Sequence, residues 1–231
     1  METTSNVMLV HGAWTDASSW SRVIPLLQRA GHRVSAVQIS TVSLADDIAV
    51  TRRALDAIPG PVTLVGHSYG GCVIDGAGNA PNVTSLVYVA AFALDEGETL
   101  ANVSRRFPAL ESMKHLRADA AGFLTVDPET FPQDFAGGVD PEQAQVMAVL
   151  QRPFNSAIFD EQAGPAAWRK RPTFYQVSEN DAIISVDLER FFAERMGAET
   201  LALRSSHASP VSHPAEIAQL ITTATRVAAT A

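Results

Sequence analysis

A chain of 231 residues, 46% of them hydrophobic, has the size and composition of one globular domain with an ordinary core. Its net charge of -8 argues against nucleic acid and anionic membrane as partners, because both attract a basic face. The single cysteine, Cys72, excludes an intramolecular disulfide and a cysteine-rich zinc site.

We expect no signal peptide at the start of the chain. Its first six residues are polar, and the apolar run after them, 7–10, is too short for a signal peptide. No apolar run approaches the ~20 residues that a membrane-spanning helix needs. We therefore expect a cytoplasmic protein without a membrane partner, and the sequence leaves open whether two copies form a homodimer.

Up to residue 92, apolar runs typical of strands alternate with amphipathic runs typical of helices. Such alternation with short connections predicts a parallel sheet wrapped by helices. The last of these strands is nearly all apolar, as expected of a strand covered on both faces. The predicted strands are 6–11, 33–39, 62–65 and 83–92, and the predicted helices are 20–30, 44–58 and 71–78.

The pattern changes between residues 95 and 171, where several prolines and the pair Gly137-Gly138 occur and no strand is obvious. An excursion of this length between two strands is typical of a lid over the catalytic edge of a sheet. The segment is too short and broken to hold a core of its own as a separate helical domain. Helical stretches are expected near 99–120, 141–150 and 156–163.

Alternation resumes after the lid, with strands predicted at 173–177 and 199–203 and helices at 187–196 and 214–228. The fold class is therefore α/β, with about six mostly parallel strands. Residues 1–94 and 172–231 form the core, and 95–171 form a helical lid inserted before the turn that follows strand 173–177. Functional groups of such sheets gather at the carboxyl ends of the strands.

Residues 62–71, Val-Thr-Leu-Val-Gly-His-Ser-Tyr-Gly-Gly, contain the pattern G-x-S-x-G between a strand and a helix. A sharp strand-to-helix turn with small neighbours would hold Ser68 in a strained backbone conformation and expose its hydroxyl above the sheet. A glycine-rich turn can match this pattern by chance. The strand before it, the helix after it and the further glycine at position 71 favour a nucleophile.

A serine hydroxyl becomes a strong nucleophile only when a base removes its proton. Of the six histidines, His207 and His213 follow the last predicted strand. His213 directly precedes a proline at the start of the last helix, where a capping role suffices. We predict His207 as the base and keep His213 as the alternative.

The base in turn needs a carboxylate that orients it. Asp181 follows the strand 173–177 and is the predicted acid. Asp95, which follows the strand 83–92, is the alternative.

The oxyanion of an acyl-transfer intermediate needs two N–H donors. We predict the backbone N–H groups of Tyr69, next to Ser68, and of Ala13, in the loop after the first strand. Gly12 lets that loop approach closely, and Trp14 is the predicted wall of the substrate pocket. No phosphate-cradling loop or metal-ligand cluster occurs, so no cofactor and no metal are expected.

With these residues assembled, the chain resembles an α/β-hydrolase over essentially its whole length. In many members the catalytic histidine lies seven positions before a proline, which fits His207 and Pro214. The chain is similar in particular to the small-lid branch of plant methyl esterases and hydroxynitrile lyases and their bacterial relatives. The motifs that carry the resemblance are His11-Gly12-Ala13-Trp14 with Trp20, the turn at 66–71, Asp181, and Ser206-His207 with Ser212-His213-Pro214.

The resemblance implies a serine esterase that cleaves an ester, lactone or thioester of a small, apolar substrate through an acyl-enzyme. The lyases carry a lysine directly after the catalytic histidine, where this chain has Ala208. Related dehalogenases and epoxide hydrolases use an aspartate nucleophile, against which Ser68 argues. Two alternatives stay open: a lyase or C–C bond hydrolase on the same triad, and a ligand-binding protein whose triad is slow.

Overall fold

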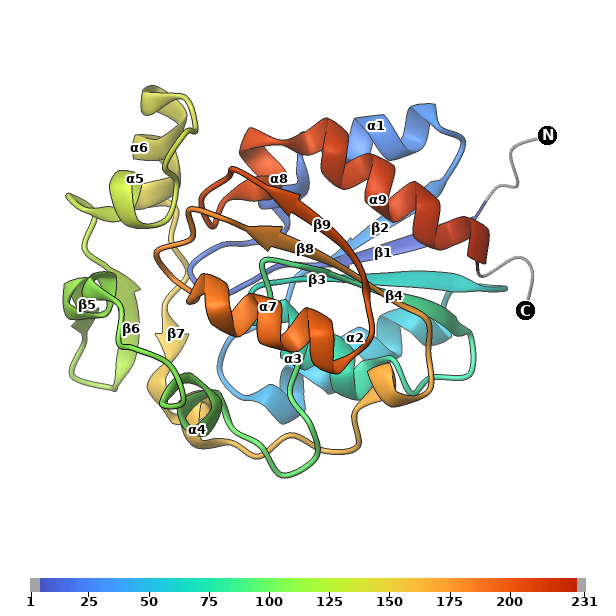
Figure 1. Cartoon of the computed structure of the whole chain (residues 1–231), viewed down its shortest axis with the longest axis horizontal. Coiled ribbons are helices and arrows are strands. Elements are labelled where there is room, and N and C mark those ends of the chain that lie inside the picture. The colour runs from blue at the N-terminus through green and yellow to red at the C-terminus, as the bar shows by residue number, and fades with distance from the viewer. Residues whose placement is uncertain (1–4, 228–231) are drawn as a thin grey trace.

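A six-stranded parallel sheet runs through the computed structural model, which describes residues 5–227 (Figure 1). The strand order is β2-β1-β3-β4-β8-β9, and every neighbouring pair is parallel. The predicted parallel sheet and its six strands are therefore confirmed. The strands are β1 (Asn6–Val10), β2 (Arg33–Val37), β3 (Val62–His67), β4 (Val83–Val89), β8 (Thr173–Ser178) and β9 (Glu199–Leu203).

Helices cover both faces of this sheet, which explains why its central strands are apolar throughout (Figure 1). Successive residues of β3 point to opposite faces: Val65 packs in the cluster below α9, and Leu64 packs in the cluster below α3. No helix among residues 5–227 is long and apolar enough to cross a membrane. One face carries α1 (Ile24–Arg29) and α9 (Pro214–Val227), and the other carries α2 (Leu44–Asp56), α3 (Gly70–Ala77) and α7 (Val186–Arg195).

The helix expected at 20–30 is wrong in its first turn. A short 3-10 helix, η1 (Ala17–Trp20), comes first, and α1 begins only at Ile24. Pro25 explains the break, because proline lacks an N–H and fits the first turn of a helix but not its interior. At the other end of the chain, the predicted final helix residue, 228, lies outside the described residues.

The segment 95–171 lies over the edge of the sheet formed by the carboxyl ends of the strands (Figure 1). Its helical elements are short, and they are joined by a small antiparallel sheet that the sequence analysis did not predict. The elements are α4 (Leu100–Ser104), η2 (Glu111–His115), β5 (Leu116–Ala118), β6 (Phe123–Val126), α5 (Phe131–Asp134), α6 (Pro141–Val149), β7 (Phe154–Asn155), η3 (Ser156–Asp160) and η4 (Ala167–Arg169).

The expectation of helix up to residue 120 is wrong because a hairpin occupies this part of the segment. Its turn is held by Asp119, whose carboxylate accepts the N–H groups of Ala121 and Phe123 at 2.8 and 2.9 Å. Gly122 follows with φ of +85°, a backbone conformation that favours glycine. The three strands of this small sheet have only two to four residues each, which is too few to show a period of two.

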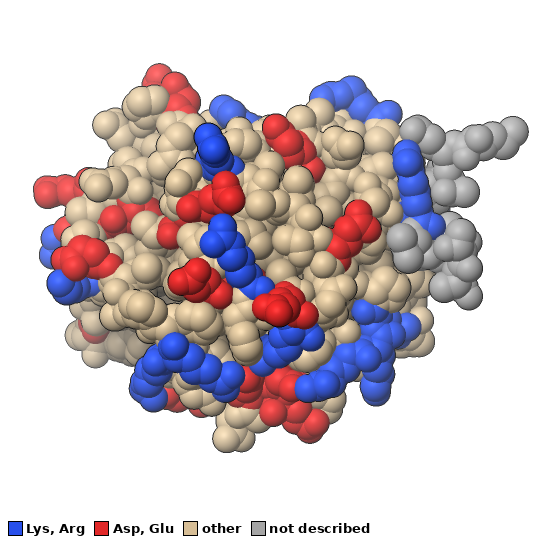
Figure 2. All heavy atoms as spheres, in the orientation of Figure 1, with Lys and Arg blue, Asp and Glu red and all other residues tan. Residues whose placement is uncertain are grey.

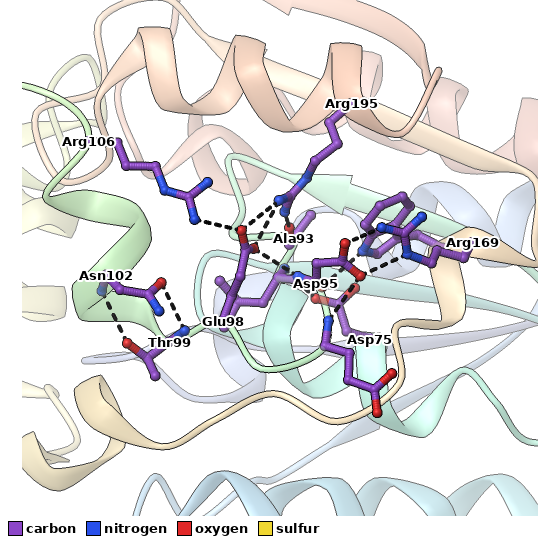
Figure 3. A network of polar contacts seen from close by, with 12 residues as sticks. Asp75, Ala93, Asp95, Glu98, Thr99, Asn102, Arg106, Arg169 and Arg195 are labelled. Carbon is purple, nitrogen blue, oxygen red and sulfur yellow. Dashed lines mark hydrogen bonds and ion pairs between the residues drawn. The ribbon is translucent and has the colours of Figure 1, made fainter.

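The two ends of this segment are fastened to each other and to the core (Figure 3). Near its start, the carboxylate of Asp95 accepts two hydrogen bonds from the guanidinium of Arg169, near its end. Glu98 pairs with Arg195 of α7 and with Arg106, each at 2.9 Å. The side chains of Glu98 and Arg195 are only 14% and 16% exposed, so this pair is largely shielded from water. We call Asp95, Glu98, Arg106, Arg169 and Arg195 the lid base.

Candidate active site

Ser68 lies directly after β3, at the turn into α3, with φ of 54°. This left-handed conformation is strained for a residue with a side chain, and the surrounding structure must impose it. Three backbone hydrogen bonds do so. The N–H of Ser68 donates to the carbonyl of Val89 at 3.1 Å, and its carbonyl accepts the N–H groups of Gly71 at 3.0 Å and Phe92 at 3.2 Å.

Glycine is required around this turn because the chain segments approach so closely. A Cβ atom on Gly66 would lie 2.5 Å from the carbonyl oxygen of Gly70, and one on Gly71 would overlap the carbonyl oxygen of Phe92. A Cβ atom on Gly12 would lie 2.7 Å from Cβ of Ser68. The loop after β1 therefore contacts the serine directly, in keeping with the expectation that Gly12 lets this loop approach closely.

The structure brings Asp181 and His207 together at the carboxyl ends of β8 and β9. Nδ1 of His207 and Oδ2 of Asp181 are 2.6 Å apart, and both side chains are fully buried. The other oxygen of Asp181 accepts the N–H groups of Ile183 and Ile184 at 2.6 and 2.9 Å. Burial alone would raise the pKa of Asp181, but the imidazole of His207 and these donors hold that pKa below its ordinary value. The group is a carboxylate that orients the imidazole.

The second ring nitrogen of His207, Nε2, is buried and has no hydrogen-bond partner among residues 5–227. No hydrogen bond to Ser68 is therefore formed in this structure. The imidazole packs against two rings, those of His67 and Phe135, each with its centroid 4.8 Å away. His67 precedes Ser68 in the chain, so the ring of His207 lies beside the turn that carries the serine.

His67 holds the loop of His207 in place. Its Nε2 donates to the carbonyl of His207 at 2.9 Å, and its ring is buried. Burial, together with the neighbouring His207, lowers the pKa of His67 to about 3. His67 is therefore neutral and places no second positive charge beside the base. The sequence alone does not predict this role, because the two residues are far apart in the chain.

His11 holds the loop of Gly12 in a comparable way. Its Nε2 accepts the N–H of Ile39 at 3.1 Å, so the ring proton resides on Nδ1 and is donated to the carbonyl of Gly12 at 2.9 Å. Burial lowers the pKa of His11 as well, and a neutral ring suits both contacts.

The alternative acid and base lie elsewhere. The carboxylate of Asp95 is engaged by Arg169 in the lid base, and Nδ1 of His213 contacts the hydroxyl of Ser212 at 2.9 Å. Neither of them pairs with His207 or Asp181. Within residues 5–227 no group of three or more histidine, cysteine, aspartate or glutamate side chains could hold a metal ion.

A cavity of about 110 Å³ opens above Ser68. Ala13, Trp14 and Tyr69 line it from the core, and Phe154 and Phe159 line it from the lid. Neither the N–H of Ala13 nor that of Tyr69 donates to a backbone acceptor within residues 5–227, and both residues line this cavity.

Two of these walls are anchored by hydrogen bonds. Nε1 of Trp14 donates to the carbonyl of Leu124 in β6 at 3.0 Å, which ties the predicted pocket wall to the lid. The hydroxyl of Tyr69 donates to Asp47 of α2 at 2.9 Å, and burial raises the pKa of this phenol far above its ordinary value. Tyr69 is therefore a neutral, fixed wall of the cavity; the sequence motif predicts its backbone role but not this anchor.

A second cavity of about 200 Å³ adjoins the first. The two share Phe92, Met113 and Ile183 as a common wall, and Phe107 and Leu188 line the far side. Most of the side chains that line the two cavities are apolar.

Comparison with known proteins points in one direction. The sequence model described as "Alpha/beta hydrolase family" matches residues 7–220. A carbendazim hydrolyzing esterase of Nocardioides sp. (strain SG-4G) is 36% identical over 110 residues, which cover 42% of this chain and 46% of that enzyme. Methylesterase 2 of Arabidopsis thaliana is 26% identical over 220 residues, which cover 80% of this chain and 81% of the relative.

Solved structures agree with this fold. A crystal structure of a polyneuridine aldehyde esterase variant has a TM-score of 0.82 to this chain at 19% identity, with 96% of this chain and 99% of the other covered. At this identity the likeness concerns the fold alone.

Proposed function

The chain belongs to the α/β-hydrolase family, in its plant methylesterase-like branch, and from this premise we propose that it cleaves a carboxylic ester with Ser68 as the nucleophile. It is a carboxylic ester hydrolase that acts on a small molecule, like the esterases to which its sequence is similar. The observation that carries the serine mechanism is the buried Asp181–His207 pair beside the strained turn of Ser68.

In this mechanism Nε2 of His207 takes the proton of the Ser68 hydroxyl as Oγ attacks the ester carbonyl. The hydrogen bond from Nδ1 to Asp181 fixes the tautomer and stabilises the imidazolium that forms. The N–H groups of Ala13 and Tyr69 bind the oxyanion. His207 then protonates the leaving alcohol, and a water molecule that it activates hydrolyses the acyl-enzyme.

The size and lining of the two cavities favour a small, apolar substrate. About 110 Å³ above Ser68 accommodates a short acyl or alcohol group, and the adjoining 200 Å³ can take a second apolar group. A lactone or thioester would react by the same steps.

Ester hydrolysis is favoured over the lyase alternative by the residue after the base. Ala208 is buried and apolar, and it offers no cation where the hydroxynitrile lyases carry lysine. A screen that includes a cyanohydrin beside esters tests this preference, and cyanohydrin cleavage without ester hydrolysis would contradict it.

The test of the nucleophile is Ser68→Ala, assayed on a short p-nitrophenyl ester. We expect kcat/KM to fall about 10⁴-fold or more, because without the serine hydroxyl no acyl-enzyme forms. Ser18→Ala is the matched control, since Ser18 is exposed and does not line this cavity, and its activity should stay within a few-fold of wild type. Full activity of Ser68→Ala would overturn the mechanism, and covalent labelling by a fluorophosphonate should disappear in that variant.

A further inference from the structure

A second carboxyl group is buried behind the Asp181–His207 pair. Glu189, in the first turn of α7, has no exposed surface, and its Oε2 accepts the N–H of Ser178 at 2.8 Å. Its other oxygen, Oε1, is buried, and no N–H or O–H of residues 5–227 donates to it. Ser178 connects the two carboxyl groups, because its N–H donates to Glu189 and its carbonyl accepts the N–H of Asp181 at 3.1 Å. The side chains of Glu189 and Asp181 interact with each other, and this interaction shifts the pKa of both.

Two carboxylate oxygens repel each other, so a contact of this kind is stable only when one group carries a proton. The donors around the two groups decide which one does. Asp181 accepts three hydrogen bonds from N–H groups, those of Ile183, Ile184 and His207, which stabilise its negative charge. Glu189 accepts one, so the proton belongs on Glu189.

The remaining groups near Glu189 offset its burial only in part, with Arg190 as the one cation that lowers its pKa. From β8, the hydroxyl of Tyr175 is neutral and donates to the carbonyl of Ala91. On α7 itself, the side chain of Arg190 is 57% exposed and lies 3.5 Å from the carboxylate of Glu179. Burial, followed by the negative charge of Asp181, raises the pKa of Glu189 well above its ordinary value.

We propose that Glu189 is a protonated carboxylic acid that donates its hydrogen through Oε1 to Asp181, and that it acts as a positioning residue for the triad. The pair then carries one negative charge, shared across a buried O–H···O hydrogen bond. No bond is made or broken in this arrangement, and the proton stays on Glu189 throughout turnover.

The protonation of Glu189 matters for the base. A second buried negative charge would stabilise the imidazolium of His207 and keep that ring protonated near neutral pH, where it could not accept the proton of Ser68. A neutral donor instead fixes the carboxylate of Asp181 without adding charge. This consequence rests on the proposed function, whereas the protonation state of Glu189 does not.

Infrared spectroscopy tests the protonation state without any assay of activity. The difference spectrum of wild type minus Glu189→Gln at pH 7 should contain the C=O stretch of a buried, protonated carboxylic acid. A difference spectrum that contains a carboxylate band and no acid band would show that Glu189 is ionised, and it would overturn the proposal. The result stands even if Ser68→Ala shows that the enzyme does not work as an esterase.

Kinetics test the positioning role. Glu189→Gln keeps a neutral donor of the same shape, so kcat/KM and the acidic limb of its pH profile should match wild type. Glu189→Leu removes the donor, and kcat should fall about 10-fold with KM unchanged. If the acidic limb of Glu189→Gln moved down by a unit or more, Glu189 would be ionised in the wild type and the proposal would be wrong. If Glu189→Leu fails to fold, the pH profile of Glu189→Gln and the infrared spectrum still determine whether Glu189 is protonated.

Discussion

Gly12 sets the distance between the loop after β1 and the nucleophile. Replacing it by alanine would place a methyl group 2.7 Å from Cβ of Ser68, with the backbone oxygen of His67 3.0 Å away. We expect Gly12→Ala to lower kcat/KM about 100-fold and the free energy of unfolding by about 1–3 kcal/mol, because the loop that bears the Ala13 N–H must move away. Ester hydrolysis and urea unfolding measure the two effects.

Gly164→Ala serves as the control for this prediction, because a Cβ atom there meets nothing within 4 Å. It should leave activity and stability close to those of wild type. Equal effects of the two substitutions would show that the tight approach at Gly12 does not matter.

Much of the candidate site can be predicted from the sequence, because each predicted residue follows its own strand. Ser68, Asp181 and His207 come after β3, β8 and β9, and parallel strands bring such positions to one edge. Glu189 could not be found in this way. It lies inside a helix, and the periodicity of that helix predicts only which of its faces is buried. Its contact with Asp181 depends on how α7 packs on β8.

At the scale of elements, the helices and strands of the core follow the hydrophobic periodicity, whereas those of the lid do not. The predicted strand 62–65 and helix 44–58 match β3 and α2 closely, because each is long enough to show its period. In the lid, β5 and β7 have three and two residues and take their conformation from pairing with β6. Pairing of this kind depends on tertiary contacts and cannot be predicted from the local sequence pattern.

We expect the lid base to contribute to the stability of the fold by holding the lid to α7. Glu98→Ala leaves the mostly buried guanidinium of Arg195 without its carboxylate partner, so the free energy of unfolding should fall by about 3 kcal/mol. Glu111→Ala breaks the exposed pair with Lys114 in the same segment and should cause no measurable change. Urea unfolding of both variants compares them, and similar stabilities would mean that the lid base does not hold the lid to α7.

At the scale of the whole molecule, the surface carries charges of both signs. On the face shown in Figure 2, acidic and basic side chains are interspersed and form no large patch of one sign. The excess of acidic residues gives an isoelectric point near 5.2. Sedimentation at several concentrations measures whether two copies associate into a homodimer.

The stability of the molecule should fall in acid because of a histidine that is buried and neutral. The pKa of His67 is about 3 in the folded chain and near 6.5 when it is exposed, so the unfolded chain binds one more proton between these values. This group alone should lower the free energy of unfolding by about 1.4 kcal/mol per pH unit as the pH falls from 6.5 toward 3.

His67→Gln isolates this effect, since an amide can still donate to the carbonyl of His207 and does not titrate. Measured by urea unfolding, the variant should lose less stability than wild type between pH 6.5 and 4, while the two curves run parallel above pH 8. Parallel curves over the whole range would contradict a buried neutral His67.

The lid base also bears on how proteins of this kind can diversify. The pairing of Asp95 with Arg169 brings the two ends of the intervening segment together (Figure 3), so this segment is a closed loop, which is also fastened to the core at Arg195 and Trp14. The entropy of closing such a loop changes little with its length. Segments of other lengths could therefore be grafted between these two residues and change which substrates enter, as long as the graft keeps the packing of Phe135 against His207.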